Sequence, residues 1–211
     1  MPSPKDVREF IFSQSVAHMT EMGFTCRKKH LVCERKSGQC RELVFFGAIR
    51  RQKYAPRASV AGLVGFPSVE LVMDCGRPSQ ECGGLWGGNS GNLRNPKHYK
   101  TWDVMSRDDL EGIGQEIIQE IDLVVLPFLE EYRDIEKVKQ ALLSENHEGS
   151  IRTQAAILWA ENSRTQALQL LRDAIEKRKG GFRKYWWDMQ QLLTFLESGD
   201  ADRLAGTLKK S

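Results

Sequence analysis

Apolar residues near the start of the chain recur every three or four positions, the spacing that places them on one side of an α-helix. Ser3 followed by Pro4 is typical of an N-cap and first turn, and Gly23 occupies the usual position just beyond a helix C-terminus. The sequence therefore predicts a helix over residues 4–22, with an apolar stripe formed by Val7, Phe10, Ile11, Val16 and Met19.

The pattern then changes to the shorter runs that are typical of β-strands. Residues 31–35 lead into a turn-like cluster at residues 36–39, and residues 40–50 return as a second strand. The centre of that strand, residues 43–46, is apolar on both faces, which indicates an interior position in a sheet. We therefore predict an antiparallel hairpin whose second strand is covered on both faces or has an extra partner surface.

Two further stretches, residues 58–64 and 69–73, are predicted to continue the sheet. Residues 76–99 follow, with six glycines and two prolines. Segments of that length without secondary structure are uncommon in compact domains and are often functional. We therefore expect a long loop here, held by Trp86, and regard it as the first place to look for a site.

The stretch from Ser106 to Leu143 has the apolar period of a helix. Ser106 and Asp109 have capping-box spacing, with Asp in place of the preferred Glu. Pro127 is predicted to kink or end the helix near residues 124–126, because proline removes a backbone donor. A second helical segment is expected over residues 135–143.

Only helical patterns follow, over residues 151–160, from Ser163 to the Gly180-Gly181 pair, and over residues 182–196. The predicted fold class is α+β. An antiparallel sheet packs against the N-terminal helix and the long Pro-kinked helix, and an all-helical C-terminal extension follows. The predicted domains are residues 1–145 and residues 146–211, with the extension packed on the first domain.

Composition and charge are those of a soluble globular protein: 40% hydrophobic residues, 28% charged residues and a net charge of +3. No run of 18 apolar residues and no signal peptide is recognisable, so we expect no membrane span and a cytoplasmic location. The five cysteines, an odd number, favour reduced thiols there. Their seven-residue spacings lack the close pairs of zinc sites, so no metal is expected.

Motifs for known chemistry are missing from the glycine-rich loop, which lacks the P-loop and dinucleotide fingerprints. No GxSxG occurs, and the acidic residues of the long helix are interpreted as a solvated face. His98, beside Lys97 at the end of the loop, is the best of the four histidines. We expect no cofactor. An enzyme with a site at residues 76–100, using His98, Asp103 or Cys75, remains one alternative.

The run at residues 177–187 combines cations with aromatic side chains, the combination by which proteins track phosphates and stack on bases. Its candidate binding residues are Lys179, Arg183, Lys184 and Trp186. The same cations also suit the end of a helix, where they complement its dipole, and at least one tryptophan is expected to pack inside. Nucleic-acid binding through this run is therefore another alternative, and it ranks above the enzyme.

The order of these features resembles the bacterial domain-of-unknown-function family 4304. The similar pieces span residues 5–145: a helix ending in Met22-Gly23-Phe24 with Arg27-Lys28-Lys29 after it, a short strand at Leu31–Arg35, paired strands, a loop leading to Trp102, and a helix ending in Val125–Leu129. The resemblance implies a small cytoplasmic bacterial protein, in some members an immunity-type partner in a toxin system. The family offers no catalytic residues to carry over.

The favoured functional interpretation is a non-enzymatic module that binds another protein, and the resemblance implies an immunity-type role for it. Large apolar and aromatic residues are available to stabilise such an interface. The chain is slightly basic, so a toxin partner need not be a nuclease. The oligomeric state is left open.

Overall fold

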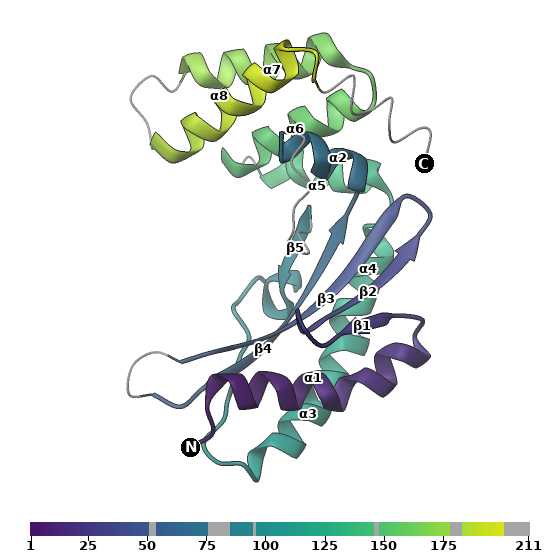
Figure 1. The fold of residues 1–211 in the computed structure, drawn as a ribbon, viewed down its shortest axis with the longest axis vertical. Helices are drawn as coiled ribbons and strands as arrows, with labels where there is room; N and C mark the ends of the chain where they lie inside the picture. Colours follow the sequence, from purple (N-terminus) through teal and green to yellow (C-terminus); the bar gives the residue numbers. More distant parts are fainter. Residues whose placement is uncertain (51–53, 76–84, 95, 146–147, 178–182, 201–211) are drawn as a thin grey trace. The chain divides into compact units, whose positions relative to one another are not determined.

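The computed structural model describes residues 1–50, 54–75, 85–94, 96–145, 148–177 and 183–200. The chain divides into two compact units, which are described separately. Unit 1 comprises Met1–Gly65 and Trp86–Arg133, and unit 2 comprises Phe66–Leu85 and Asp134–Ser211. The elements confirm the predicted α+β class (Figure 1). The division differs from the one expected at residues 145/146, because residues 134–145 and a segment of the first half belong to unit 2.

The opening helix, α1 (Pro4–Glu21), begins where the sequence predicts and ends one residue earlier, with Met22 as its C-cap. The Ser3 Oγ accepts a hydrogen bond from the backbone N–H of Asp6 at 3.1 Å, and the Asp6 carboxylate accepts one from the Ser3 N–H at 3.2 Å. This reciprocal capping box satisfies two donors that the first helical turn leaves without partners. At the other end, Gly23 has φ +82°, the left-handed conformation that stops a helix.

Unit 1 contains an antiparallel sheet in the order β1-β2-β3-β4-β5, with β6 also paired to β4. The strands are β1 (Thr25–Arg27), β2 (Val32–Ser37), β3 (Cys40–Ile49), β4 (Arg57–Gly65), β5 (Trp86–Asn89) and β6 (Trp102–Asp103). The predicted β2–β3 hairpin is confirmed, with Gly38 at φ +59° in its turn. The interior position predicted for β3 is also confirmed, because β3 lies between β2 and β4.

One face of this sheet forms the core of unit 1. Phe46 on this face meets Phe12 of α1 in an edge-to-face contact at 5.6 Å. On the same face a Cβ at Gly62 would lie 2.7 Å from Val125, so glycine here lets the long helix approach the sheet closely. Both α1 and the long helix thus cover this face, and they also contact one another.

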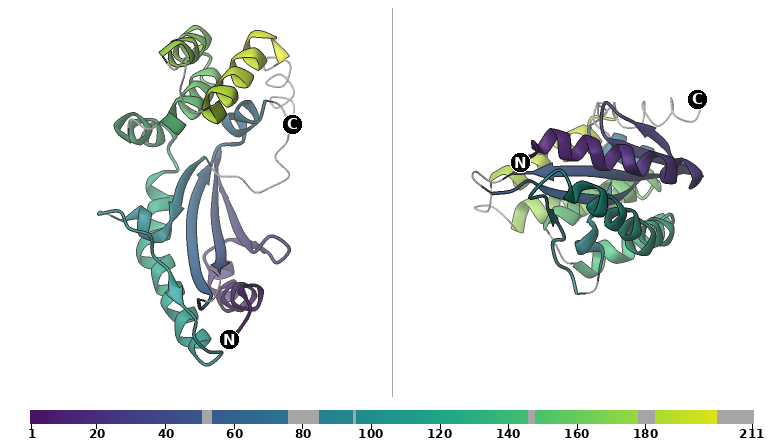
Figure 2. Two further views of the ribbon diagram at one scale, coloured as in Figure 1. Left: turned by 90° about the vertical axis from the view of Figure 1, so that its left-hand side faces the viewer. Right: turned by 90° about the horizontal axis from the view of Figure 1, so that it is seen from below.

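The long helical stretch consists of α3 (Asp109–Glu120), the π-helical segment η2 (Ile121–Val125) and α4 (Leu126–Glu131). Figure 2 shows it as one continuous path beside the sheet. The interruption lies where Pro127 was predicted to disturb the helix, since proline deprives the preceding turn of an N–H donor. Ser106 is not the N-cap, because the helix begins after Asp108. The Asp109 carboxylate nevertheless accepts the Ser106 N–H at 2.7 Å.

Two predictions in the middle of the chain were wrong. Residues 69–73 form no strand, because they belong to α2 (Pro67–Met73), in which Pro67 occupies the first turn and Val69 and Val72 are buried at helical spacing. The expected long loop contains β5 and the 3₁₀ helix η1 (Ser90–Leu93). The backbone of β4 supplies the partners that make a strand of the glycine-rich residues of β5.

Unit 2 is helical, with α2 packed against α6. Its other helices are α5 (Ile135–Glu145), α6 (Glu148–Ala160), α7 (Arg164–Lys177) and α8 (Arg183–Glu197), which confirms the helices predicted after residue 150. Small buried residues allow close packing of α6 and α7: Ala155, Ala156, Ala167 and Ala174. The chain turns between these two helices at Asn162, which has φ +64°.

The prediction that all cysteines are reduced thiols was wrong for one pair. Cys26 of β1 and Cys33 of β2 are directly opposite one another in the sheet and form a disulfide. The sequence contains only their separation of seven residues, whereas the register of β1 against β2 brings the two Cα atoms to 4.0 Å. The disulfide fastens the short edge strand β1 to the sheet.

Candidate functional site

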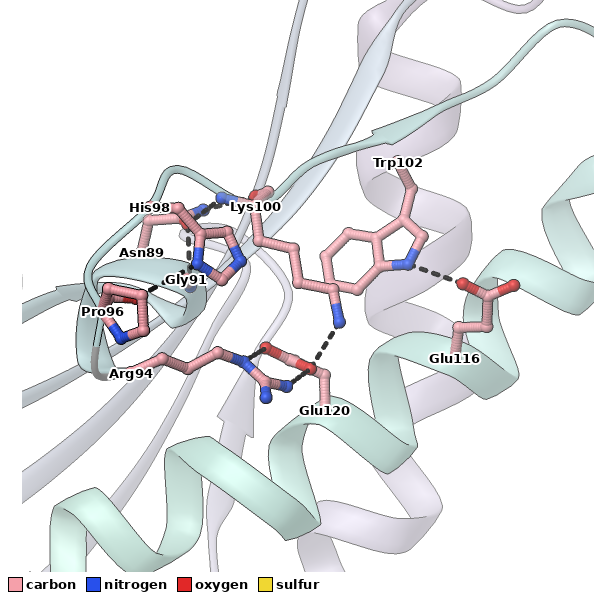
Figure 3. Close-up of polar contacts among 9 residues, drawn as sticks. All are labelled: Asn89, Gly91, Arg94, Pro96, His98, Lys100, Trp102, Glu116 and Glu120. Atoms are coloured by element: carbon pink, nitrogen blue, oxygen red, sulfur yellow. Dashed lines mark hydrogen bonds and ion pairs between the residues drawn. The ribbon is translucent and has the colours of Figure 1, made fainter.

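The segment Lys97–Met105, called here the edge segment, runs along the outer side of β4 and includes β6. Figure 3 shows that side chains on its inner side meet two acidic residues of α3. The Nζ of Lys100 lies 2.6 Å from the Glu120 carboxylate. Arg94 donates to the same carboxylate through Nη2 at 2.5 Å and through Nε at 3.3 Å. Glu120 is thus shared by two cations that come from the connection between β5 and β6.

Glu120 is only 3% exposed, so its ionised form depends on these partners. Burial opposes ionisation and is the largest single influence on the group. The hydrogen bonds from Arg94 and Lys100 outweigh it, so the pKa of Glu120 lies below its ordinary value. At neutral pH the carboxylate is therefore charged and holds the edge segment against α3.

A second inner contact lies one helical turn earlier on α3. The indole N–H of Trp102 donates to the Glu116 carboxylate at 2.8 Å. The Lys100 ammonium also lies over the Trp102 ring, 4.9 Å from its centroid, a favourable cation–π distance. Lys100, Trp102 and the fully buried Val104 therefore all point inward, with the alternation of an extended strand.

The backbone of the segment is held from β5. The Asn89 side chain accepts the Lys100 N–H and donates to the Lys100 carbonyl, both at 2.8 Å. A Cβ at Gly91 would lie 2.1 Å from the His98 carbonyl oxygen, so only glycine allows this close approach. Further along, the Val104 N–H donates to the Pro56 carbonyl at 2.8 Å. The edge segment is thus fixed at both ends and in its middle.

The outer side of the segment is exposed. Tyr99 is 60% and Met105 is 65% exposed, and the Asp103 carboxylate lies 2.8 Å from Arg57 on the same surface. Because alternate residues of a strand direct their backbone groups to opposite sides, the N–H and C=O groups of Tyr99, Thr101 and Asp103 point outward. In the described part of the chain these groups form no hydrogen bond. This side is therefore an open sheet edge.

A comparable buried carboxylate lies elsewhere in unit 1. Glu42 of β3 is fully buried between Arg35 of β2 and Arg133, which follows α4. The hydrogen bond to Glu42 raises the pKa of Arg133 above its ordinary value. Residues of two strands and the end of the long helix meet here and leave no open edge, so this cluster joins the helix to the sheet.

The residues that the sequence proposed as a site do not all belong to one part of the fold. His98 lies exposed in the edge segment, with Nδ1 at 3.3 Å from the Pro96 carbonyl oxygen. Trp86 lies at the opposite end of β5, with its ring 6.2 Å from that of Tyr132. Asp103 is paired with Arg57, and Cys75 belongs to unit 2.

The basic and aromatic candidates near the C-terminus remain predictions. Lys179 lies outside the described residues. Arg183, Lys184 and Trp186 belong to α8, but their side chains also lie outside the described part.

Sequence reasoning missed the central residue of the site. The acidic residues of the long helix were predicted to form a solvated face, and this is wrong for Glu120. One signal was present, since Glu120 lies three residues after Ile117 and so falls on the apolar stripe of the helix. An acidic residue on such a stripe is buried only with a partner, and the partners lie 20 and 26 positions away in the sequence.

Two kinds of feature are absent from the described residues. No three side chains of His, Cys, Asp or Glu come together there in a way that would hold a metal ion. No helix there has both the length and the apolar character needed to cross a bilayer.

No family model matches the chain, and neither a curated protein nor a solved structure is significantly similar to it. The resemblance to family 4304 therefore stays a prediction.

Proposed function

We propose that the chain is a non-enzymatic protein-binding module and that the edge segment is its binding surface. The observation that supports this most is the contrast between the two sides of the segment. Its inner side is fixed by Glu120, Glu116 and Asn89, while its outer side presents unpaired backbone groups and two exposed apolar side chains.

This contrast favours binding for a physical reason. Association costs the entropy of ordering loops and side chains at the interface, and a segment that is already fixed avoids much of that cost. Exposed tyrosine and methionine side chains, such as Tyr99 and Met105, are enriched in protein interfaces. An open strand edge adds main-chain hydrogen bonds to an extended partner segment. The partner is a protein because these groups match a polypeptide strand.

The ionisable groups of the segment have other tasks in this proposal. Glu120, Lys100 and Asp103 are engaged in ion pairs that hold the segment in place, so we assign them positioning roles. An immunity-type role, in which the bound protein is a toxin, stays a prediction of the family resemblance.

Affinity capture from a lysate of the source organism tests the proposal. The tagged chain is compared with Tyr99→Ala and with Tyr54→Ala, a matched control in which an equally exposed tyrosine (68%) lies off the edge segment. We expect a nuclease-resistant protein to be retained by the wild type and the control but lost with Tyr99→Ala. Retention of nucleic acid alone, released by salt, would instead favour the run at residues 177–187.

A further inference from the structure

We infer that the protein bound at the edge segment is a second copy of this chain, paired antiparallel through the same edge. The inference rests on the proposed function, because it specifies the partner of that surface. Two copies joined in this way would form one sheet that continues across a twofold axis, the commonest symmetry of protein dimers.

The first argument is the symmetry of the outward residues about Trp102. Tyr99 and Met105 lie three positions before and after it, and Thr101 and Asp103 lie one position before and after it. Antiparallel pairing centred on Trp102 therefore places Tyr99 of each copy opposite Met105 of the other. A methionine sulfur against an aromatic ring is a favourable contact. Both side chains, 60% and 65% exposed in the single chain, would be covered.

The second argument is that neighbouring registers match less well. Only residues with outward backbone groups can form the hydrogen bonds, so the smallest shift of register, by two residues, moves the centre from Trp102 to Thr101 or to Asp103. A centre at Asp103 places the two Asp103 carboxylates opposite one another, and like charges in that position destabilise a strand pair. A centre at Thr101 places Tyr99 opposite Asp103 and leaves Met105 without its apolar neighbour. Of these three registers, only the one centred on Trp102 pairs the apolar Tyr99 with Met105 and the Thr101 hydroxyl with the Asp103 carboxylate.

The third argument is that the edge is ready to pair. Open edges of regular strands are a known hazard, which proteins block with prolines, inward charges or bulges. The edge segment has no proline between Lys97 and Met105, and its one ammonium on the inner side, that of Lys100, is bound to Glu120. The Met105 N–H is already held by the Asp109 carboxylate at 2.9 Å, so the main-chain donors for a second strand are the N–H groups of Tyr99, Thr101 and Asp103.

Sedimentation equilibrium tests the inference directly. The chain is measured from about 10 µM to about 1 mM, a range that detects even a weak dimer. We expect the average mass to rise from 24.1 kDa toward twice that value. A single species of 24.1 kDa at every concentration overturns the inference.

Thr101→Pro removes one outward N–H that has no partner within the described residues. We expect it to raise the dimer dissociation constant at least about tenfold, because proline blocks strand addition. Circular dichroism and the melting temperature confirm that the variant is folded. If Thr101→Pro is not folded, the dimer dissociation constant of Tyr99→Lys is measured instead. A lysine is tolerated at this exposed site of the single chain, but it cannot make the apolar contact with Met105 of the second copy. Unchanged dimerisation of a folded Thr101→Pro or Tyr99→Lys protein contradicts the inference.

Cysteine cross-linking tests the register. Tyr99→Cys and Met105→Cys proteins are mixed and oxidised, with the parent chain as the background control. The Trp102-centred register predicts disulfide-linked pairs in the mixture and not in either variant alone, because identical positions lie six residues apart, about 20 Å along the strand. Equal cross-linking in the separate variants overturns the register.

The two proposals fail in different ways. If the chain is monomeric but captures another protein that Tyr99→Ala loses, the second copy is excluded and the proposed function stands. If Tyr99→Ala, like the control Tyr54→Ala, changes neither the mass nor the captured proteins, both proposals are contradicted.

Discussion

Replacing Glu120 by glutamine removes the charge that holds the edge segment while preserving the volume of the side chain. Glu120 accepts from Arg94 and Lys100 at 2.5 and 2.6 Å, and it is 3% exposed. Both of these short contacts reach Oε2, whereas Oε1 accepts from the Arg94 Nε at 3.3 Å. A glutamine oxygen in place of Oε2 leaves the NH₂ group facing the Arg94 Nε–H donor, so one charge-assisted hydrogen bond is lost. Such a bond contributes about 1.5–3 kcal/mol.

The cations lessen this loss. The side chains of Arg94 and Lys100 are 38% and 32% exposed, so the released cation turns to water rather than remaining buried. We therefore expect Glu120→Gln to lower the free energy of unfolding by about 2 kcal/mol at pH 7. Urea denaturation followed by circular dichroism measures this difference.

Glu116→Gln is the matched control, one turn away on α3. Glu116 is exposed and, within the described residues, accepts only the Trp102 indole N–H, which an amide oxygen can also accept. Its replacement should change the free energy of unfolding by less than about 0.5 kcal/mol. Equal losses in the two variants would mean that Glu120 has no special role in holding the segment.

The pH dependence provides an independent check with a definite sign. Because the pKa of Glu120 is lowered in the folded chain, its contribution is complete above the ordinary carboxyl value of 4.5. The contribution is lost as the pH falls through the lower, folded-state pKa. The difference in the free energy of unfolding between the wild type and Glu120→Gln should therefore become smaller below pH 4.5. A gap that stays constant from neutral to acidic pH would refute the electrostatic explanation.

Three further outcomes are expected. Gly91→Ala should lower the free energy of unfolding by about 1–3 kcal/mol, because its Cβ would lie 2.1 Å from the backbone of the adjoining loop. Gly112→Ala should instead raise the free energy of unfolding by about 0.5–1 kcal/mol, because this helical position has open space around it. Thermal melts compare the two variants. Glu42→Ala should lower the free energy of unfolding, measured by urea denaturation, by about 3 kcal/mol, because it leaves two arginines without their buried partner. Reducing the Cys26–Cys33 disulfide should cost about 2.5 kcal/mol by loop-closure entropy, which parallel titrations with and without reductant measure.

Local signals in the sequence determined the elements whose information is local. The first helix follows from its apolar period together with the Ser3 cap and Gly23, because capping and helical spacing involve residues within one or two turns. The β2–β3 hairpin follows in the same way from a glycine turn between two apolar runs. The C-terminal helices and the disturbance before Pro127 also depend on neighbouring residues, and the α+β class followed from them.

Tertiary contacts decided the rest. Residues 69–73 are rich in β-formers, yet Pro67 at a helix start and burial of Val69 and Val72 favour a helix. The glycines of β5 have little strand propensity and become a strand only through pairing with β4. The disulfide likewise depends on the register of β1 against β2.

The candidate site shows the same division. The sequence marked the region through its glycines and His98, but the residues that fix it are Glu120, Arg94 and Lys100, which are separated along the chain. A buried carboxylate is stable only when distant cations are brought within hydrogen-bonding distance, and a strand edge is open only relative to a completed sheet. The sequence therefore determined the local elements, and only the tertiary structure decided which charges meet and which edge is left unpaired.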